Sequence, residues 1–228
     1  LRELLNQWDP ACGMALPSQW CQGRTAYGGI TAASALLAAR QLAGDAGPMR
    51  SVQLAFVGPA QGHLEYTASL LRAGRSVSSV GVDVSAEAGM AARALFVFGQ
   101  SRSSGIAHDF SQPPPVRGPE SYPRLELSAA PGVPAFIGNF ELRPAAGAMP
   151  LSAADNPEQV VWVRHGDADG VDPEAALLAL ADALPPAAYT SYRAPAPIST
   201  ITWSVDLLGL VPAGRWFLLR SASVHAGD

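Results

Sequence analysis

Two runs of apolar residues recur at helical spacing and predict two buried helices. Residues 173–184 are almost all Ala or Leu, with Pro173 at the first helical position and Pro185 directly after the run. Residues 29–42 are small and apolar in the same way, and they follow a turn-rich segment. Because neither run has an extended polar face, both helices should be buried on most sides.

Elsewhere, apolar and polar residues alternate with the period of two that is typical of β-strands. In the first half of the chain this pattern predicts strands over residues 49–57, 63–72, 76–85 and 90–99. In the second half it predicts strands over residues 135–143, 159–165, 198–207 and 216–225. A short helix within residues 1–8 and a short strand within residues 14–20 are expected before them.

The two halves of the chain repeat one pattern. Each has a buried helix, an alternating strand, a turn with Gly and Pro, and a strand with a Leu-Leu-Arg sequence, at residues 70–72 and 218–220. Such a duplication predicts an α+β architecture in which an antiparallel sheet wraps around one buried helix, twice, and the two sheets can join edge to edge. We expect an N-terminal domain over residues 1–100, a surface linker over 101–134 and a C-terminal domain over 135–228.

Composition and charge exclude some classes of protein and count against others. Hydrophobic residues make up 48% of the 228 residues and charged ones only 15%, which excludes a chain that is disordered throughout. A net charge of -4 gives no reason to expect a nucleic-acid partner, and no apolar run is long enough for a membrane span. Two cysteines are too few for a disulfide framework or a zinc site, which favours a cytoplasmic protein. The Ala- and Gly-rich composition, with Arg preferred to Lys, indicates a bacterial coding bias.

Asp182 interrupts the apolar pattern of the second predicted helix. It lies in the last turn, where the helix dipole disfavours an anion. A carboxylate in such a setting is paired, hydrogen-bonded or used in chemistry, so Asp182 could be a capping or ion-paired residue, or a catalytic one. We expect it to point toward the polar face of the strand at 198–207, which carries Thr200 and Thr202. Burial should raise its pKa, because desolvation disfavours the charged form.

Motifs of several other enzyme classes are absent from the sequence. It has no Gly-x-Ser-x-Gly nucleophile elbow, no P-loop and no His-Glu-x-x-His helix. The acidic segment 167–172 lacks the correctly spaced final ligand of a calcium loop, so no metal site is expected.

Several stretches resemble the TesB-like (type II) acyl-CoA thioesterases, and together they span nearly the whole chain. They are Gly-Arg-Thr-Ala-Tyr-Gly-Gly at 23–29, the strand at 49–59, Leu-Arg-Ala-Gly-Arg-Ser at 71–76, Leu-Ala-Asp at 180–182 and Ser-Thr-Ile-Thr-Trp-Ser at 199–204. The resemblance implies a tandem (double) hotdog fold and hydrolysis of fatty acyl-CoA without a cofactor. It also implies a homo-oligomer, as a dimer of double hotdogs. The scattered histidines count against the dehydratases and hydratases of the same fold.

The resemblance also implies which residues act on the substrate. In that family an Asp on the second hotdog helix, a Thr or Ser on the next strand and a Gln near the C-terminus hold the water that attacks the thioester. Asp182 and Thr200 match the first two members, with Thr202 as the rival for the second. No Gln follows Gln159, so the third member has no counterpart.

Further residues are candidates for substrate binding. The turn Tyr27-Gly28-Gly29 can supply backbone N–H groups to an oxyanion, since Gly lets a ligand approach the backbone closely. Arg24 and Arg75 stand near the glycine turns and could meet a phosphate of CoA, although for each one alone a solvated surface arginine is the favoured interpretation. An apolar tunnel between helix and sheet should hold the acyl chain.

Two further expectations concern what the sequence does not contain. Because the third family residue is missing, a non-catalytic acyl-CoA or acyl-chain binding protein of the same fold is the alternative function. The second copy stops at residues 225–228, where the first continues into the two strands of residues 76–99. We therefore expect a further C-terminal piece that forms two strands and carries the missing Gln. The alternative is a truncated, inactive domain whose strand edge pairs with another chain.

Overall fold

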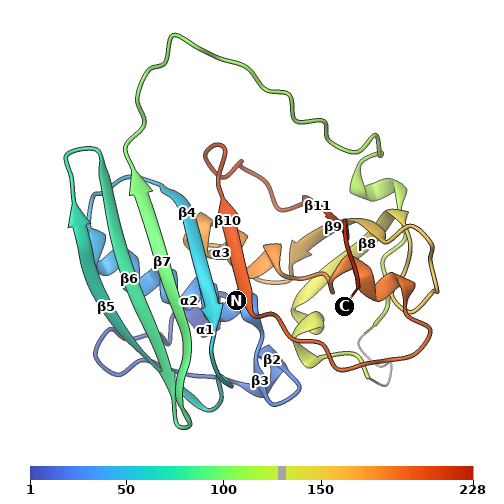
Figure 1. Ribbon diagram of the computed structural model, residues 1–228, viewed down its shortest axis with the longest axis horizontal. Coiled ribbons are helices and arrows are strands. Elements are labelled where there is room, and N and C mark those ends of the chain that lie inside the picture. Colours follow the sequence, from blue (N-terminus) through green and yellow to red (C-terminus); the bar gives the residue numbers. More distant parts are fainter. Residues whose placement is uncertain (128–131, 228) are drawn as a thin grey trace.

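The computed structural model describes residues 1–127 and 132–227 and contains three antiparallel sheets, of which the two larger ones lie side by side (Figure 1). Residues 128–131, in the predicted linker, and Asp228 at the end of the predicted C-terminal domain lie outside the described residues. The larger sheet has six strands in the order β1-β5-β6-β7-β4-β10, and the smaller has three in the order β11-β9-β8. The α+β class and the antiparallel pairing expected from the sequence are confirmed.

The first half of the chain forms one sheet around one helix, as predicted. After the short helix α1 (Arg2–Leu5), its elements are β1 (Met14–Ala15), a 3-10 turn (Ser18–Trp20), the small hairpin β2 (Cys21–Gln22) and β3 (Thr25–Ala26), α2 (Gly28–Ala43), β4 (Met49–Phe56), β5 (His63–Ala73), β6 (Val77–Ala86) and β7 (Gly89–Gly99). Helix α2 packs against β5, β6 and β7. Ten of its residues are buried, half of them Ala, and these small side chains let the helix approach the sheet closely.

The second half contributes strands to both sheets. Its elements are β8 (Phe140–Gly147), β9 (Glu158–His165), α3 (Pro173–Ala181), β10 (Thr202–Asp206) and β11 (Phe217–Ala222), with 3-10 turns at Pro119–Ser121, Ala135–Asn139 and Ala187–Ser191. Strand β10 pairs with β4 of the first half, whereas β11 pairs with β9. The two halves therefore meet edge to edge at β4 and β10, within the larger sheet, and the strands of the second copy are divided between the two sheets.

Three predicted strands are shorter in the structure, for identifiable reasons. The strand predicted over 135–143 begins only at Phe140, because Phe136 and Ile137 are buried in a 3-10 turn. The strand predicted over 198–207 begins at Thr202, since its partner β4 ends at Phe56 before the Gly58-Pro59 turn. Thr200 therefore precedes the strand, which corrects its expected place. The strand predicted over 216–225 ends at Ala222, opposite the first residue of β9.

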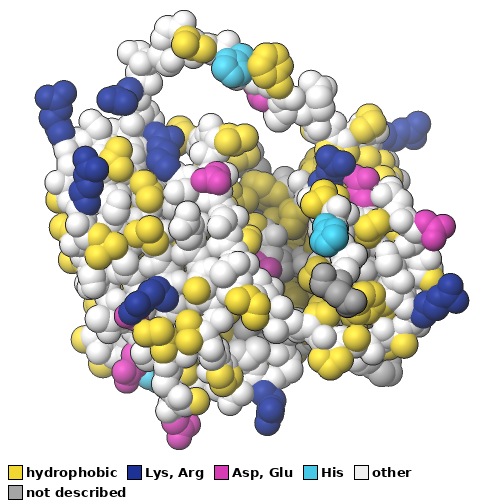
Figure 2. Space-filling model, in the orientation of Figure 1, with side chains coloured by type: hydrophobic (Ala, Val, Ile, Leu, Met, Phe, Trp, Pro, Cys, Tyr) yellow, Lys and Arg dark blue, Asp and Glu magenta, His cyan; other side chains and the backbone are white. Residues whose placement is uncertain are grey.

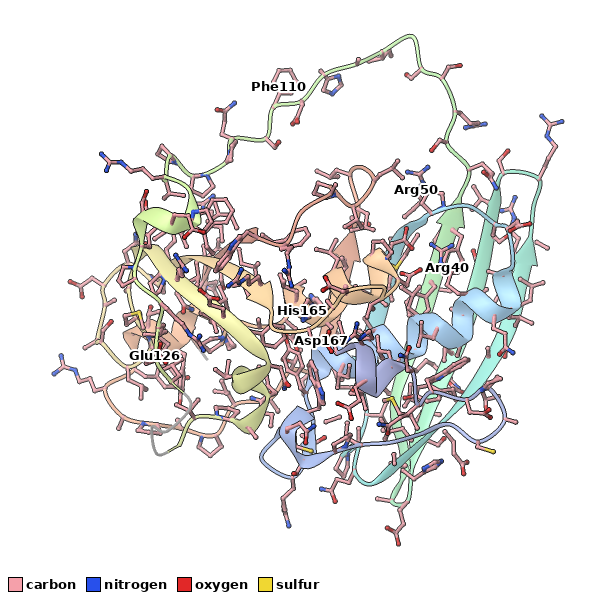
Figure 3. The ribbon with its side chains drawn as sticks, turned by 180° about the vertical axis from the view of Figure 1, so that it is seen from behind. Arg40, Arg50, Phe110, Glu126, His165 and Asp167 are labelled. Atoms are coloured by element: carbon pink, nitrogen blue, oxygen red, sulfur yellow. The ribbon has the colours of Figure 1, made fainter. Side chains whose placement is uncertain are left out.

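The segment that joins the halves runs over the surface, as expected, but only part of it stands clear of the body. The first part arches away from both sheets in Figure 1, and Figure 3 shows Phe110 on this arch. The later part packs on the smaller sheet, because the carbonyl of Arg117 accepts a hydrogen bond of 2.9 Å from Trp162 Nε1 and Leu125 N–H donates to the Leu142 carbonyl at 2.8 Å. Part of the predicted linker thus belongs structurally to the second half.

Helices α2 and α3 pack against each other in opposite directions and join the two halves. The start of α2 meets the end of α3, where Tyr27 contacts Ala179, and the end of α2 meets the start of α3, where Arg40 contacts Glu174. Figure 2 shows the surface hollowed between the two lobes, with hydrophobic side chains gathered in the hollow. Among the described residues, no helix combines the length and the hydrophobicity that crossing a membrane requires.

Candidate active site

Asp182 lies at the junction of the two helices. It is the residue that caps the C-terminal end of α3, one residue beyond the last helical turn. Its carboxylate faces the first turn of α2: a methyl group added at Gly28 would lie 2.7 Å from Asp182 Oδ2. The antiparallel packing therefore places a carboxylate from the second half at the N-terminus of the buried helix of the first half.

The surroundings of Asp182 favour its protonated form more than water does. Burial raises the pKa of Asp182 to about 7, and the backbone N–H of Gly29 acts in the opposite direction by lowering it. The expected rise is confirmed. A group with a pKa near neutrality can take up and release a proton at physiological pH, which is what a general base requires.

Tyr27 connects the two helices at this point. Its side chain is 1% exposed, and its hydroxyl donates a hydrogen bond of 3.0 Å to the carbonyl of Ala179. Its ring stacks on Phe136 with the centroids 4.0 Å apart. Burial raises the pKa of Tyr27 well above its usual value, and the charge of Asp182 adds to the rise. The Tyr27 side chain thus holds the end of α3 beside α2, which leaves the backbone of the turn as the part that can meet a substrate.

The glycines of the turn allow the helices to approach. A methyl group at Gly29 would lie 2.9 Å from the carbonyl oxygen of Ala179, so only glycine fits there without moving α3. Gly28 separates Asp182 from the ring of Phe56, which a methyl group at Gly28 would meet at 3.2 Å. The first N–H groups of a helix lack intrahelical partners and carry partial positive charge, so this turn can stabilise an oxyanion.

Thr200 and Thr202 lie near this end of the β4–β10 pair. Phe56 N–H donates to the Ile201 carbonyl at 2.9 Å, and Thr202 pairs with Ala55. Since Phe56 also borders Gly28, both threonines belong to the segment next to the turn. Both are exposed, and among the described residues neither forms a hydrogen bond with Asp182. The structure thus leaves the choice between them open.

The two candidate arginines lie apart from each other. Arg24 is exposed in the tight turn between β2 and β3, close in sequence to Gly28. Arg75 is exposed in the turn between β5 and β6, near the pair Val77–Gly99, whereas Phe56 pairs with Ala92. Seven residues of β7 separate these two pairs, which is about 24 Å of extended strand. The structure therefore does not bring Arg75 to Asp182.

The expected acyl tunnel stays a prediction. The space between α2 and its sheet is filled by buried side chains, among them Ile30, Leu36, Val82 and Phe96.

Sequence reasoning also missed Phe56 and Ala179, which border the turn. Only the antiparallel packing of α2 and α3 reveals them, and no sequence signal specifies that packing.

Replacing Gly28 with Ala should displace the Asp182 carboxylate, because the new methyl group would occupy its position. We expect kcat/KM for thioester hydrolysis to fall by about 10- to 100-fold, since displacements of 1 Å can cost that much. Steady-state kinetics of purified Gly28→Ala protein test this, with Gly105→Ala as control because nothing lies within 4 Å of that position. Unchanged kinetics in Gly28→Ala would show that the carboxylate position is unimportant.

Comparisons with known proteins agree with this architecture. A family model described as the acyl-CoA thioesterase N-terminal domain matches residues 16–99, and one described as the acyl-CoA thioesterase C-terminal domain matches residues 113–228. Among curated proteins, none matches the chain significantly in sequence.

Solved structures share the fold. A conserved protein of unknown function with the hot dog fold from Alicyclobacillus acidocaldarius is similar with a TM-score of 0.77 and 25% identity, over 86% of this chain and 72% of that one. The tesB protein of Mycobacterium avium subs paratuberculosis is similar with a TM-score of 0.73 and 20% identity, over 95% and 80%. An acyl-CoA thioesterase II from Mycobacterium marinum is similar with a TM-score of 0.66 and 19% identity, over 88% and 78%. The architecture is that of a double hotdog.

Proposed function

Since this chain belongs to the acyl-CoA thioesterase family and is a thioester hydrolase, we propose that it hydrolyses fatty acyl-CoA through a water activated by Asp182. The products are a free fatty acid and CoA. One observation supports this assignment above the others: the Asp182 carboxylate is held against the first turn of α2, beside Gly28 and Gly29. A general base and a source of oxyanion donors therefore lie together.

The chemistry needs no covalent intermediate. Asp182 accepts a proton from water while the water oxygen bonds to the thioester carbonyl carbon. The negative charge that develops on the carbonyl oxygen faces the backbone N–H groups at the start of α2. The carbon–sulfur bond then breaks, and the CoA thiolate receives a proton from Asp182 or solvent. A thioester carbonyl is reactive enough for a well-positioned water to suffice.

We assign Thr200 the role of fixing the attacking water, with Thr202 as the competing candidate. Thr200→Val and Thr202→Val each remove one hydroxyl while keeping the shape of the side chain. Loss of the hydroxyl that holds the water should lower kcat by about 10-fold, since a lost hydrogen bond costs roughly 1–2 kcal/mol. The two variants are matched controls for each other under identical steady-state conditions. Equal and full activity in both would remove the threonines from the mechanism.

One observation favours the alternative, a non-catalytic acyl-CoA binding protein. In the part of the chain that the structure describes, no side-chain donor forms a hydrogen bond with Asp182, although a water held by several groups is expected for efficient turnover. Steady-state hydrolysis of an acyl-CoA series, with the released thiol detected, separates the two functions. Tight binding without thiol release would establish the alternative, and turnover that depends on chain length would establish the hydrolase.

We further propose a bacterial, cytoplasmic enzyme of fatty acid metabolism that assembles as a dimer of double hotdogs. The coding bias and the two cysteines support the first part, and the family resemblance supports the second. Light scattering after size-exclusion chromatography measures the assembly. A mass of one 23.7 kDa chain at micromolar concentration would contradict the dimer.

A further inference from the structure

A shallow pocket on the smaller sheet lies outside the site around Asp182. Its volume is about 190 Å³, and three arginines but only one acidic residue line it: Arg124, Arg164, Arg215 and Glu141. Pockets that hold a whole small ligand usually measure roughly 300–1,000 Å³, so this one fits only a part of a larger molecule. The arginines favour a part that carries negative charge.

Arg164 is held in place. Its Nε and Nη2 groups donate to Glu141 Oε2 at 2.9 and 2.5 Å, and its guanidinium lies 4.7 Å from the centre of the Trp216 ring. Among the described residues, its Nη1 group has no hydrogen-bond partner. A guanidinium fixed by a carboxylate and an aromatic ring, with a donor to spare, is a preorganised binding group for a phosphate.

Arg124 and Arg215 are available to a ligand. Each is exposed and has one exposed acidic neighbour: Arg124 lies 3.3 Å from Glu126, and Arg215 lies 3.8 Å from Asp169. Exposed ion pairs of this kind contribute little free energy. Either guanidinium can therefore turn toward a phosphate at small cost.

His165 adds no further charge to the pocket, because its ring is neutral. Its side chain lines the pocket, lies on β9 at the junction of the two halves (Figure 3) and is 8% exposed. Its Nε2 lies 2.8 Å from the Ala176 carbonyl, which can only accept, so Nε2 carries the proton. In the neutral ring Nδ1 is then an acceptor, and it has no partner among the described residues. Burial lowers the pKa of His165, which favours this neutral form.

We propose that this pocket binds a phosphate group in the nucleotide part of the acyl-CoA substrate, held by Arg124, Arg164 and Arg215. The proposal rests on the proposed function and names the part of the substrate that these residues recognise. Phe140 lines the pocket, and its ring centre lies 6.1 Å from that of Tyr27, which precedes α2 beside Asp182. One layer of aromatic rings thus separates the pocket from the thioester site.

The test compares two thioesters with the same acyl group, an acyl-CoA and the acyl-pantetheine that lacks the nucleotide. We expect the double variant Arg124→Gln/Arg215→Gln to raise KM for acyl-CoA by about 10-fold, because two charge-assisted hydrogen bonds are lost. Its kcat and its kinetics on acyl-pantetheine should not change. Arg220→Gln is the matched control, since Arg220 is an exposed, ion-paired arginine on β11 outside the pocket lining. Unchanged KM for acyl-CoA, or an equal change for both thioesters, would overturn the proposal.

Two further measurements distinguish the proposal from two other outcomes. In the first, the pocket binds a free nucleotide instead of acyl-CoA; in the second, the protein does not hydrolyse thioesters at all. Adenosine 3′,5′-bisphosphate should inhibit acyl-CoA hydrolysis competitively, and about 10-fold more weakly in the double variant. If the bisphosphate binds through these arginines while KM for acyl-CoA is unaffected, the pocket serves a free nucleotide and the proposal is wrong. If the wild type hydrolyses neither thioester, the proposed function fails. Calorimetry with CoA then tests, independently of catalysis, whether the pocket binds CoA. Weaker CoA binding by the double variant supports the pocket, and equal or absent binding refutes it.

Discussion

Asp182→Asn is expected to lower kcat for acyl-CoA hydrolysis by at least about 100-fold, because an amide cannot accept the proton of the attacking water. The amide keeps the shape of the carboxyl group, so the turn at Gly28 and Gly29 should remain intact. Steady-state kinetics on one acyl-CoA measure the loss, and circular dichroism verifies the fold. Wild-type activity in Asp182→Asn would show that Asp182 is structural and that another group activates the water.

The pH profile gives an independent signature of the same residue. Burial raises the pKa of Asp182 to about 7, and only the ionised form accepts a proton. The wild-type kcat/KM should therefore rise with pH and level off above an inflection near pH 7. Measurements from pH 5 to 9 test this, with the stability of the protein verified at each pH. A flat profile, or an inflection near pH 4, would mean that Asp182 is not the group that titrates.

The same shift predicts how stability changes with pH. A carboxyl whose folded pKa lies above its unfolded value near 3.8 binds protons more tightly in the folded state. Its contribution to stability is fully present below pH 4 and is lost as the pH rises to about 7. Asp182→Asn should remove this dependence and make the protein more stable than wild type at pH 8, by roughly 1–3 kcal/mol. Urea unfolding at pH 4 and pH 8 measures the difference.

The sequence predicted the parts whose patterns are local. The buried helix at 29–42 and the strands of the first half match α2 and β4 to β7 within one or two residues, because each has its own period and its own glycine turns. The antiparallel α+β class followed from the repeat, whereas the pairing of β10 with β4 within the larger sheet did not. Asp182 stood out because a carboxylate at the end of an apolar helix conflicts with local preference.

What the sequence could not predict depends on contacts between distant residues. Strand β10 begins opposite the end of its antiparallel partner β4, so Thr200 lies before the strand although apolar and polar residues alternate on both sides of it. The role of Tyr27 rests on Ala179, which is 152 residues away, and no spacing rule connects them. The third family residue and the two further strands expected for the second copy stay predictions.

The far end of the α2–α3 pair should be the most sensitive point for stability. The Glu174 carboxylate is 9% exposed, accepts a hydrogen bond of 2.9 Å from the backbone N–H of Met49, and forms an ion pair with Arg40. Arg40 also donates to the Gly47 carbonyl and lies over the Phe98 ring. One partly buried pair therefore connects both helices, the start of β4 and the loop before it.

Arg40→Met should lower the free energy of unfolding by about 3–5 kcal/mol at pH 7, because it leaves the buried Glu174 carboxylate without its cation. The double variant Arg40→Met/Glu174→Gln should recover part of this loss, since no uncompensated charge remains. Urea unfolding of both proteins measures these changes. The control is Arg220→Gln, which removes an exposed ion pair and should change the free energy of unfolding by less than about 1 kcal/mol. If Arg40→Met is no more destabilising than Arg220→Gln, the ion pair does not connect the two halves. If the double variant is as unstable as the single one, the loss arises instead from the hydrogen bond to Gly47 and the contact with Phe98.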